Sequence, residues 1–400
     1  MRVFAIGDTH LKATHRRNPA RIAALEQILA AVEDARPDCI VWPGDLFHER
    51  STIDDRNLLR VFVTAMADMC PVVIVRGNHD AHRDLEIFGC LRTEHSVYVI
   101  ATPRVVRLEN LTIACLPFPE EGALVASGYA PADIPDAAAR ALDAIFMELG
   151  HELQVARDRG DATLFIGHSN VVGAKASTGQ PLVGAEIALR PEHLQRLGDT
   201  PKLLSHIHEP QNIHGATFIG SIAPMDWSET SPRRFLDLEY AAGAWAITSR
   251  PIHLPGLWHV EGLLARDRFD WVVKNGPEGA VLDPPASWRG QEVRVRFKFV
   301  AADAGLLDQA KAQILAAFAE AAHLELEPVA IAEREVRAPQ VVAAKTLSDK
   351  LDAWTAAVGL PTGAGVQVKL AALESTEAAT LLAGIQAQLQ APRREASVAA

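Results

Sequence analysis

The stretch VVIVRGNHDAH, Val72 to His82, places a hydrophobic strand directly before a group of polar residues. Its first four residues are branched aliphatics and predict a strand that is buried on both faces. The chain then turns into a glycine, an amide, an imidazole and a carboxylate: Gly77, Asn78, His79 and Asp80. Because open α/β sheets hold their ligands beyond the carboxyl ends of their strands, this junction predicts a functional site.

The same succession of a strand and a polar turn recurs along the first 220 residues. Further strands are predicted at RVFAIG (2–7), CIVWPG (39–44), VYVI (97–100), TIACLPF (112–118), TLFIGH (163–168), KLLSH (202–206) and ATFIGS (216–221). The segment from Pro19 predicts a helix with Ile22, Leu25, Leu29 and Val32 on one face. Short strands that alternate with amphipathic helices indicate a layered α/β fold.

Five of these strand ends carry carboxylate, amide or imidazole side chains: Asp8 and His10, Asp45 and His48, Asn78 and His79, His168, and His206 and His208. A single histidine beside a strand is more often structural than a ligand, so the prediction depends on their convergence. Residues two apart in extended backbone point the same way and can reach one ion together. So many donors exceed one tetrahedral zinc site and suit two cations that share a carboxylate, which favours phosphoester hydrolysis.

The composition limits the class of protein. A chain of 400 residues with 48% hydrophobic content predicts a soluble protein of two or three folding units. No apolar run reaches the roughly 18 residues of a membrane span, and we expect a cytoplasmic protein. The formal charge of −11 argues against coating of nucleic acid but not against a local DNA site. The cysteines lack metal-binding spacing and are expected to be buried: Cys39, Cys70, Cys90 and Cys115.

The pattern changes after residue 250. EVRVRFKFV (292–300) alternates strictly, which predicts a strand with Val293, Val295, Phe297 and Phe299 on its buried face. A helix over 307–321 and a strand near Leu324 complete a small β-α-β unit. Two apolar helical stripes follow, Leu347, Leu351, Trp354 and Val358, closed by Gly359, and then Leu381, Leu382, Ile385 and Leu389. The tail from Pro392 is expected to be disordered.

The motifs GDTHL (7–11), GDLFH (44–48), GNHD (77–80), GHS (167–169) and SHIH (205–208), in this order, resemble those of the calcineurin-like metallophosphoesterases. GHSNVVGAKAS (167–177), HIHEPQ (206–211) and FIGSIAPMDWSE (218–229) are similar to segments of the SbcD-type DNA exonuclease subunits. The resemblance implies a two-layered β-sandwich core flanked by helices, with a small α+β cap domain and C-terminal helices. The motifs that carry the resemblance cover most of residues 1–240. The remainder resembles the family only in the layout of its predicted elements.

The resemblance also implies roles for individual residues. One metal would be held by Asp8, His10 and His208, the other by Asn78, His168 and His206, and both by a bridging Asp45. The implied metal is Mn²⁺, although the donors also suit Mg²⁺, Fe²⁺ or Zn²⁺. His79 corresponds to the catalytic histidine that is not a ligand, and His48 to a second histidine that contacts the substrate. Gly77 is expected to permit the turn, and Asp80 to brace the loop.

Further residues are candidates for substrate binding. Gly220 and Ser221 lie in a stretch that resembles the one beside the substrate, although a simple turn explains them equally well. Arg294, Arg296 and Lys298 form the polar face of the strand 292–300 and could contact DNA phosphates, but a solvated face is the commoner explanation. Ser205 stands where the family commonly has glycine before its His-x-His pair, which could alter the local backbone.

The resemblance implies a manganese-dependent DNA exonuclease and endonuclease that acts on double-stranded ends in repair or recombination. Its domains are predicted at 1–250 (phosphoesterase), 251–335 (cap and DNA recognition) and 336–400 (helical segment). The sequence has no Gly-Lys dipeptide and therefore no phosphate-binding loop, so an SbcC-like coiled-coil ATPase would be a separate chain. This ATPase could dock on the C-terminal helices, which could equally pack on the cap, and the family suggests a homodimer.

Two alternatives remain. A phosphoesterase that acts on small nucleotides or phosphomonoesters would use the same metals, but the segment beyond residue 250 favours a macromolecular substrate. A non-catalytic scaffold with a decayed metal site would lack ligands, and all seven expected ligand residues are present.

Overall fold

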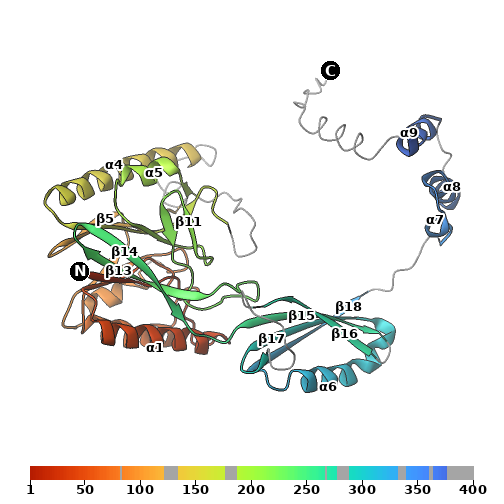
Figure 1. The fold of residues 1–400 in the computed structure, drawn as a ribbon, viewed down its shortest axis with the longest axis horizontal. Helices are drawn as coiled ribbons and strands as arrows, with labels where there is room; N and C mark the ends of the chain where they lie inside the picture. Colours follow the sequence, from red (N-terminus) through yellow and green to blue (C-terminus); the bar gives the residue numbers. More distant parts are fainter. Residues whose placement is uncertain are drawn as a thin grey trace. The chain divides into compact units, whose positions relative to one another are not determined.

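The computed structural model describes residues 1–81, 83–120, 134–175, 187–265, 268–276, 288–331, 339–359 and 364–375. The chain divides into two compact units, residues 1–330 and residues 331–400. The first unit contains three main sheets, and the described residues of the second beyond Ile331 form helices and the turns between them (Figure 1). The predicted domain boundaries at 250 and 335 remain predictions.

The first sheet has six strands in the order β14-β13-β1-β2-β3-β4. The strands β1 to β4 are parallel, and the hairpin of β13 and β14 joins antiparallel to β1. Parallel neighbours need crossover connections, which α1 and α2 supply here. The elements are β1 (Arg2–Ala5), α1 (Asn18–Ala35), β2 (Cys39–Trp42), α2 (Ile53–Ala67), β3 (Val72–Val75), the 3₁₀-helix η1 (Glu86–Cys90), β4 (Val97–Ile100), β13 (Arg233–Ala241) and β14 (Ala244–Ile252).

The second sheet also has six strands, in the order β11-β12-β10-β7-β6-β5. Its four central strands are parallel, and its two edge strands are antiparallel to their neighbours. The elements of this half are β5 (Arg104–Leu108), β6 (Leu111–Leu116), α4 (Ile134–Asp158), β7 (Ala162–His168), α5 (Pro191–Arg196), β10 (Lys202–Ser205), β11 (Gln211–Ile213) and β12 (Ala216–Phe218). A two-stranded ribbon of β8 (Asn170–Val171) and β9 (Ala188–Leu189) accompanies them.

The two sheets pack face to face, and each is covered by helices on its outer side (Figure 1). The inner cluster joins aliphatic side chains of both sheets, among them Val3, Val41, Val73, Ile113, Ile166 and Leu203. On the outer faces, α1 and α2 bury Leu25, Ile28 and Val63, while α4 and α5 bury Phe146, Leu153 and Leu194. Each such side chain stabilises the fold by about 1.5–3 kcal/mol. The predicted α/β sandwich flanked by helices is therefore confirmed.

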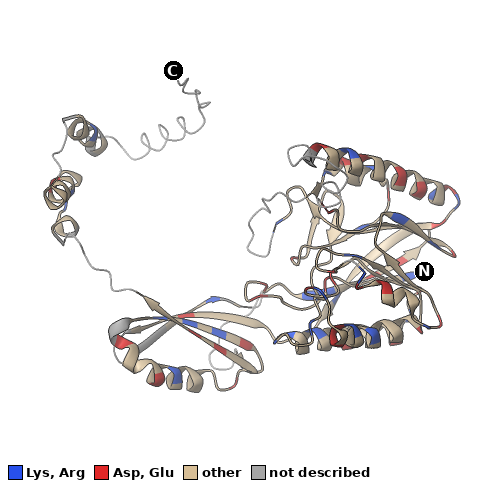
Figure 2. Ribbon diagram, turned by 180° about the vertical axis from the view of Figure 1, so that it is seen from behind, with Lys and Arg blue, Asp and Glu red and all other residues tan. Residues whose placement is uncertain are grey.

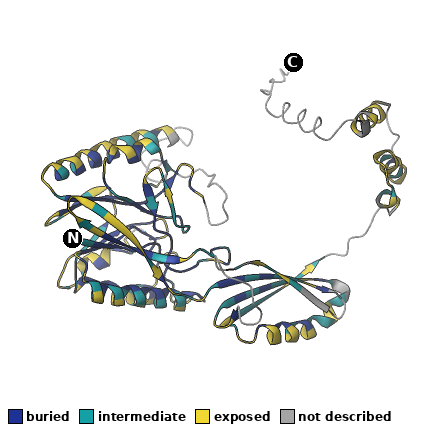
Figure 3. Cartoon of the chain, viewed as in Figure 1, coloured by how far each residue is buried: buried dark blue, intermediate teal, exposed yellow. Residues whose placement is uncertain are grey.

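The hairpin of β13 and β14 was not predicted. Most residues of β14 are exposed (Figure 3), because the strand forms the edge of the first sheet and has little to bury. In β13 the aliphatic residues alternate with charged ones such as Asp237, which is buried and pairs with Arg2 at 2.6 Å. Cys90 lies exposed at the end of η1, so the expectation of burial is wrong for this cysteine and correct for the other three.

A third sheet follows the sandwich, with four strands in the order β16-β15-β17-β18. Its elements are β15 (Leu257–Ala265), β16 (Arg268–Asn275), β17 (Glu292–Val300), the 3₁₀-helix η4 (Ala301–Leu306), α6 (Leu307–Ala317) and β18 (His323–Ile331). The predicted alternation of β17 and the β-α-β unit are confirmed, whereas β15 and β16 were missed. Helix α6 ends four residues earlier than predicted, at Ala317, where Phe318 leaves the helical conformation with φ of −113°. The ring of Phe318 lies 4.5 Å from that of Trp288.

The second unit contains α7 (Pro339–Ala343), α8 (Leu347–Val358) and α9 (Ala364–Ser375). Helix α8 has the predicted bounds, with Thr346 as its N-cap and Gly359 in the left-handed conformation at its end. Its side chains Leu347, Trp354 and Val358 are 52%, 47% and 49% exposed. The predicted stripe 381–389 and the tail from Pro392 lie outside the described residues. In the described part of the chain, each helix is too short or too polar to cross a lipid bilayer.

Candidate metal centre

All seven predicted ligand residues come together at one end of the sandwich. Each follows or ends a parallel strand, and the carboxyl ends of parallel strands meet at the same edge of a sheet. The first sheet supplies Asp8 and His10 after β1, Asp45 after β2 and Asn78 after β3. The second sheet supplies His168 at the end of β7, and His206 and His208 after β10.

One group of donors surrounds His10. The Nε2 atoms of His10 and His208 lie 2.9 Å apart, and Asp45 Oδ2 lies 3.6 Å from His10 Nε2. Asp8, His10 and Asp45 offer ligand atoms within 4.8 Å of one another. Ligands held at about 2.1 Å from one ion lie about 3 Å apart, so these distances suit a single cation.

A second group of donors surrounds Asn78. Its Oδ1 lies 2.9 Å from His168 Nε2 and 3.0 Å from His206 Nδ1. Asp45 Oδ2 is 3.3 Å from His168 Nε2, and Asp45, His168 and His206 form another set of candidate ligands. The same oxygen of Asp45 therefore faces both groups, which is the geometry of a bridging carboxylate.

The donor set fits two divalent cations. His10 is buried, and its Nε2 faces both His208 Nε2 and Asp45 Oδ2, so the ring presents a nitrogen donor to the first group. Neutral imidazole and amide donors alternate with two carboxylates, so the centre keeps positive charge after two cations bind. Mixed oxygen and nitrogen ligands of this kind suit Mn²⁺ but do not separate it from Fe²⁺ or Zn²⁺.

The pKa values of the buried ligands show how strongly these groups interact. Burial raises the pKa of Asp8 to about 6 against the opposing charge of His168, and the nearby Asp45 adds to the rise. Burial would raise the pKa of Asp45 too, but His168 and His10 bring it well below its usual range. Burial lowers the pKa of His10. Cations at the centre would stabilise both carboxylates in their charged form.

Backbone amides hold the carboxylates in place. The amide of His206 donates to Asp8 at 3.2 Å, and the amide of His79 donates to Asp45 Oδ1 at 2.9 Å. Asp80 accepts three hydrogen bonds of 3.0–3.1 Å from the amides of Leu46, Phe47 and Gly77. The carboxylate of Asp80 therefore braces the backbone of the ligand loops, as the sequence indicated.

His79 and His48 lie beside the two donor groups. His79 is exposed, and its Nδ1 donates to the backbone oxygen of His48 at 2.5 Å, so Nε2 can serve another partner. The ring centroids of His79 and His10 are 4.8 Å apart, and those of His79 and His48 are 6.0 Å apart. His10, His48 and His79 also lie within ligand distance of one another, so geometry alone does not separate a catalyst from a ligand.

Gly220 and Ser221 lie next to the ligands rather than on the rim. Ser221 forms a parallel bridge with Asp8 and is buried. Its hydroxyl donates to Ala223 O at 3.0 Å and accepts from Arg233 at 2.8 Å. The backbone of Ser221 therefore contacts the strand that carries Asp8, while its hydroxyl is used within the protein, and its predicted contact with substrate remains a prediction.

The basic residues of β17 lie on the third sheet, along which basic and acidic residues are interspersed (Figure 2). Arg294 and Arg296 both pair with Glu327 of β18, at 2.7 Å in the case of Arg296. Lys298 is exposed. Both arginines therefore contact a carboxylate of the neighbouring strand, and their predicted contact with DNA phosphates remains a prediction.

Sequence reasoning missed three groups that orient or surround the ligands. His208 Nδ1 donates to Glu229 Oε1 at 2.8 Å, and His168 Nδ1 donates to the backbone oxygen of Pro43 at 2.8 Å. The ring of Phe118 lies 5.3 Å from that of His206. Glu229 follows His208 by 21 residues in an irregular loop, where no periodicity marks it.

Three ligand residues adopt left-handed backbone conformations, with φ of +50° for His10, +50° for Asp45 and +95° for His206. Such conformations in residues other than glycine store about 1–2 kcal/mol each. Ser205, which stands where the family commonly has glycine, is buried directly before His206. Three of the seven non-glycine residues with positive φ in the described part of the chain thus present ligands.

Replacing Gly77 by alanine is expected to lower the free energy of unfolding by about 3 kcal/mol and to weaken metal binding. Gly77 is not in a left-handed conformation, and the turn depends instead on its lack of a side chain, because an added Cβ would collide with the carboxylate and the backbone nitrogen of Asp45. Thermal unfolding and metal titration measure the two effects. Gly305→Ala is the control, because nothing lies near its added Cβ. Equal behaviour of the two variants would contradict the close approach.

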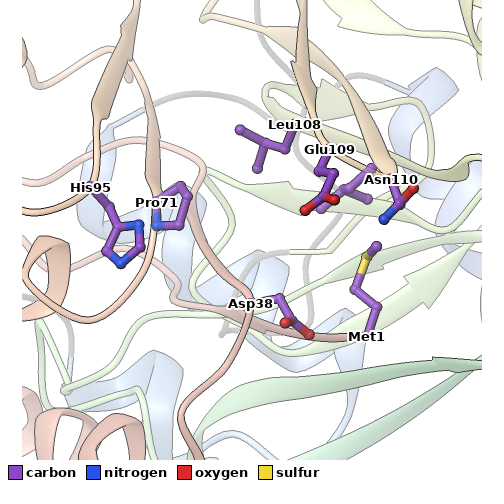
Figure 4. Close-up of a pocket in the computed structure, with 8 residues that line it drawn as sticks. Met1, Asp38, Pro71, His95, Leu108, Glu109 and Asn110 are labelled. Atoms are coloured by element: carbon purple, nitrogen blue, oxygen red, sulfur yellow. The ribbon is translucent and has the colours of Figure 1, made fainter.

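The hollow in Figure 4 lies at the other end of the sandwich. It has a volume of about 490 Å³, and its lining includes Met1, Asp38, Pro71 and His95. These residues precede β1, β2, β3 and β4, whereas the ligands follow the strands. The hollow is therefore separate from the candidate metal centre.

Comparison with known proteins places the centre in a family context. The family model described as calcineurin-like phosphoesterase matches residues 1–210, a range that includes all seven candidate ligands. A dimetal phosphatase from Danio rerio is similar in structure, with 12% identity, a TM-score of 0.41 and coverage of 63% of this chain and 96% of its own. For the protein TT1561 of Thermus thermophilus these values are 12%, 0.33, 62% and 98%. No curated protein matches the chain.

Proposed function

Because the chain belongs to the calcineurin-like phosphoesterase family, a family of metal-dependent hydrolases, we propose that it hydrolyses phosphodiester bonds at double-stranded DNA ends. In this proposal it acts in the cytoplasm, in DNA repair or recombination, as both an exonuclease and an endonuclease. The proposed metals are two Mn²⁺ ions, one held by Asp8, His10 and His208, the other by Asn78, His168 and His206, and both by Asp45.

The observation that carries the proposal is the position of the segment FIGSIAPMDWSE (218–229). This segment has the most specific similarity to the SbcD-type exonuclease subunits. Its Ser221 forms a bridge with Asp8, and its Glu229 bonds to His208, so it contacts ligands from both sheets. The segment that resembles the SbcD-type subunits therefore includes two residues that contact candidate metal ligands, so the similarity concerns the site of the proposed reaction.

The exposure of the site suits a large substrate. Asp8, His10 and His168 are buried, whereas Asn78 and His79 are exposed. A phosphodiester of a long DNA backbone can therefore approach the rim without entering a closed cavity. Divalent ions bound at the centre would neutralise charge on the phosphate and lower the pKa of the attacking water. His79 is positioned to donate a hydrogen bond or a proton to the phosphate or to the leaving oxygen.

Partners complete the proposal. We infer that the exposed apolar residues Leu347, Trp354 and Val358 of α8 bind a coiled-coil ATPase subunit as an amphipathic helix would bind a groove. The chain would work as a homodimer with two centres. Lys298, the exposed cation of β17, would contact DNA phosphate more readily than Arg294 or Arg296.

Degradation of end-labelled double-stranded DNA by the purified chain with Mn²⁺ tests this function. We expect cleavage that chelation removes and that Mn²⁺ restores, and a generic phosphomonoester serves as the competing substrate. Reactions with and without the ATPase subunit show whether cleavage of DNA ends depends on that partner. Hydrolysis of the phosphomonoester with DNA untouched in both reactions would favour a small-molecule phosphoesterase instead.

A further inference from the structure

Two histidine ligands of the centre have chemically different partners on their second ring nitrogen. His168 donates its Nδ1 proton to a neutral backbone oxygen, that of Pro43, whereas His208 donates to the carboxylate of Glu229. A carboxylate only accepts hydrogen bonds, so this contact places the proton of His208 on Nδ1 and leaves the lone pair on Nε2. That Nε2 atom is the one that lies 2.9 Å from His10 Nε2, inside the first donor group.

Glu229 is fixed in this position by its own contacts. Its Oε2 accepts from the amide of Met225 at 3.0 Å and lies 3.4 Å from Arg233 Nη1. Arg233 also donates to the backbone oxygen of Glu229 at 2.8 Å. Glu229 and Arg233 are only 6% and 4% exposed, so neither side chain can readily exchange its partner for water. The carboxylate is therefore held rigidly against the imidazole.

The two donor groups consequently differ in charge. The first contains Asp8 together with His208, whose ring is backed by Glu229, whereas the side chains of the second, Asn78, His168 and His206, include no carboxylate. Asp45 faces both groups and does not distinguish them. A carboxylate behind a histidine ligand makes the ring a better donor and fixes its orientation, an effect of about 10- to 100-fold in metal affinity.

We propose that Glu229 is a positioning residue that makes the ion site of Asp8, His10 and His208 the tighter of two unequal sites. The inference rests on the proposed two-metal function and deepens it. The site of Asn78, His168 and His206 would then fill second as the Mn²⁺ concentration rises. In the unmodified protein, the rate of phosphodiester hydrolysis would rise with the Mn²⁺ concentration as this second, weaker site fills. In a protein without the Glu229 charge, the rate would rise as the first site fills.

Calorimetric titration of the full chain with Mn²⁺ tests the proposal. The wild-type protein is expected to bind two ions with separate affinities. In Glu229→Gln, the tighter dissociation constant should rise by about 10- to 100-fold while the weaker one stays unchanged. The control is Asp237→Asn, which removes a charge from a similarly buried carboxylate that pairs with Arg2 instead of a ligand. It should leave both affinities unchanged.

The outcomes separate the two proposals. Absence of Mn²⁺ binding by the wild-type chain would overturn the two-metal function itself. Two ions that bind the wild-type chain but weaken equally in Glu229→Gln, or remain unaffected, would overturn only the role of Glu229. Circular dichroism of both variants shows whether a loss reflects unfolding, because a general loss of structure would weaken both sites.

A measurement on the unmodified protein keeps the inference testable if Glu229→Gln does not fold. Long-range ¹H–¹⁵N correlation spectra of the chain loaded with Zn²⁺, a diamagnetic probe, report which ring nitrogen of His208 bears the proton. A proton on Nδ1 with a strongly downfield shift is expected, since it is shared with a carboxylate. A proton on Nε2, or no proton on either nitrogen, would overturn the proposal.

Discussion

The Asp45→Asn variant is expected to lose both metal ions and to hydrolyse DNA about 10³-fold more slowly or worse. Asparagine has the volume of aspartate and can still accept the hydrogen bond from the His79 amide, so the loop should keep its shape. What disappears is the negative charge that faces both donor groups, 3.6 Å from His10 Nε2 and 3.3 Å from His168 Nε2. Without it, each remaining group is too weak to hold a cation firmly.

Metal content per chain, measured by elemental mass spectrometry after gel filtration, checks this result beside the rate of DNA cleavage. Asp237→Asn again serves as the buried-carboxylate control and should retain two ions. Full metal occupancy in Asp45→Asn would contradict the bridging role. Loss of a single ion would assign Asp45 to one site alone.

The His79→Gln variant should keep both ions and yet lose about 10²- to 10⁴-fold in turnover, the range in which general acid–base catalysis contributes. Its side chain is exposed beside the centre, whereas its backbone amide binds Asp45, and glutamine preserves that amide. The substitution therefore removes the imidazole without disturbing the bridging carboxylate. The expected loss falls on kcat more than on KM, because the histidine acts on the reacting phosphate.

Single-turnover DNA cleavage at saturating Mn²⁺, together with metal content, distinguishes the roles of His79. His95→Gln is the matched control, since His95 is exposed at the opposite end of the strands. If His79→Gln lost an ion, His79 would be a ligand, which its proximity to His10 and His48 permits. If it cleaved DNA normally, the catalytic assignment would be wrong.

The ligand residues could be found from the sequence because strand ends are recognisable locally. Buried strands such as β3 are continuous aliphatic runs, and the polar residues that follow them are few. Parallel strands then bring these ends together by rule, whatever the details of packing. The role of Asp80 in bracing the loop could also be predicted locally, because its partners Gly77, Leu46 and Phe47 lie in two adjacent loops that carry ligands.

Groups that depend on distant contacts could not be found in this way. Glu229 lies in an irregular loop, and only the folded chain brings it to His208. The alternation of β17 correctly separated its buried face from its more polar face, but it could not show that Glu327 on another strand pairs with both Arg294 and Arg296. The strands β13 to β16 were missed because charged residues and partly exposed faces weaken the aliphatic signal that marked the inner strands.

The ligands come from both halves of the sandwich, and this arrangement makes the ions a cross-link between segments far apart in the chain. His10 and His208 are separated by 198 residues, and Asn78 and His168 by 90. Like a disulfide that closes a long loop, shared coordination restricts the unfolded chain more than the folded one. Neither half alone presents a complete set of ligands, so the ions can be fully held only after the two sheets have docked. Metal uptake would thus be a late event in folding, and separation of the sheets the route by which a bound ion escapes.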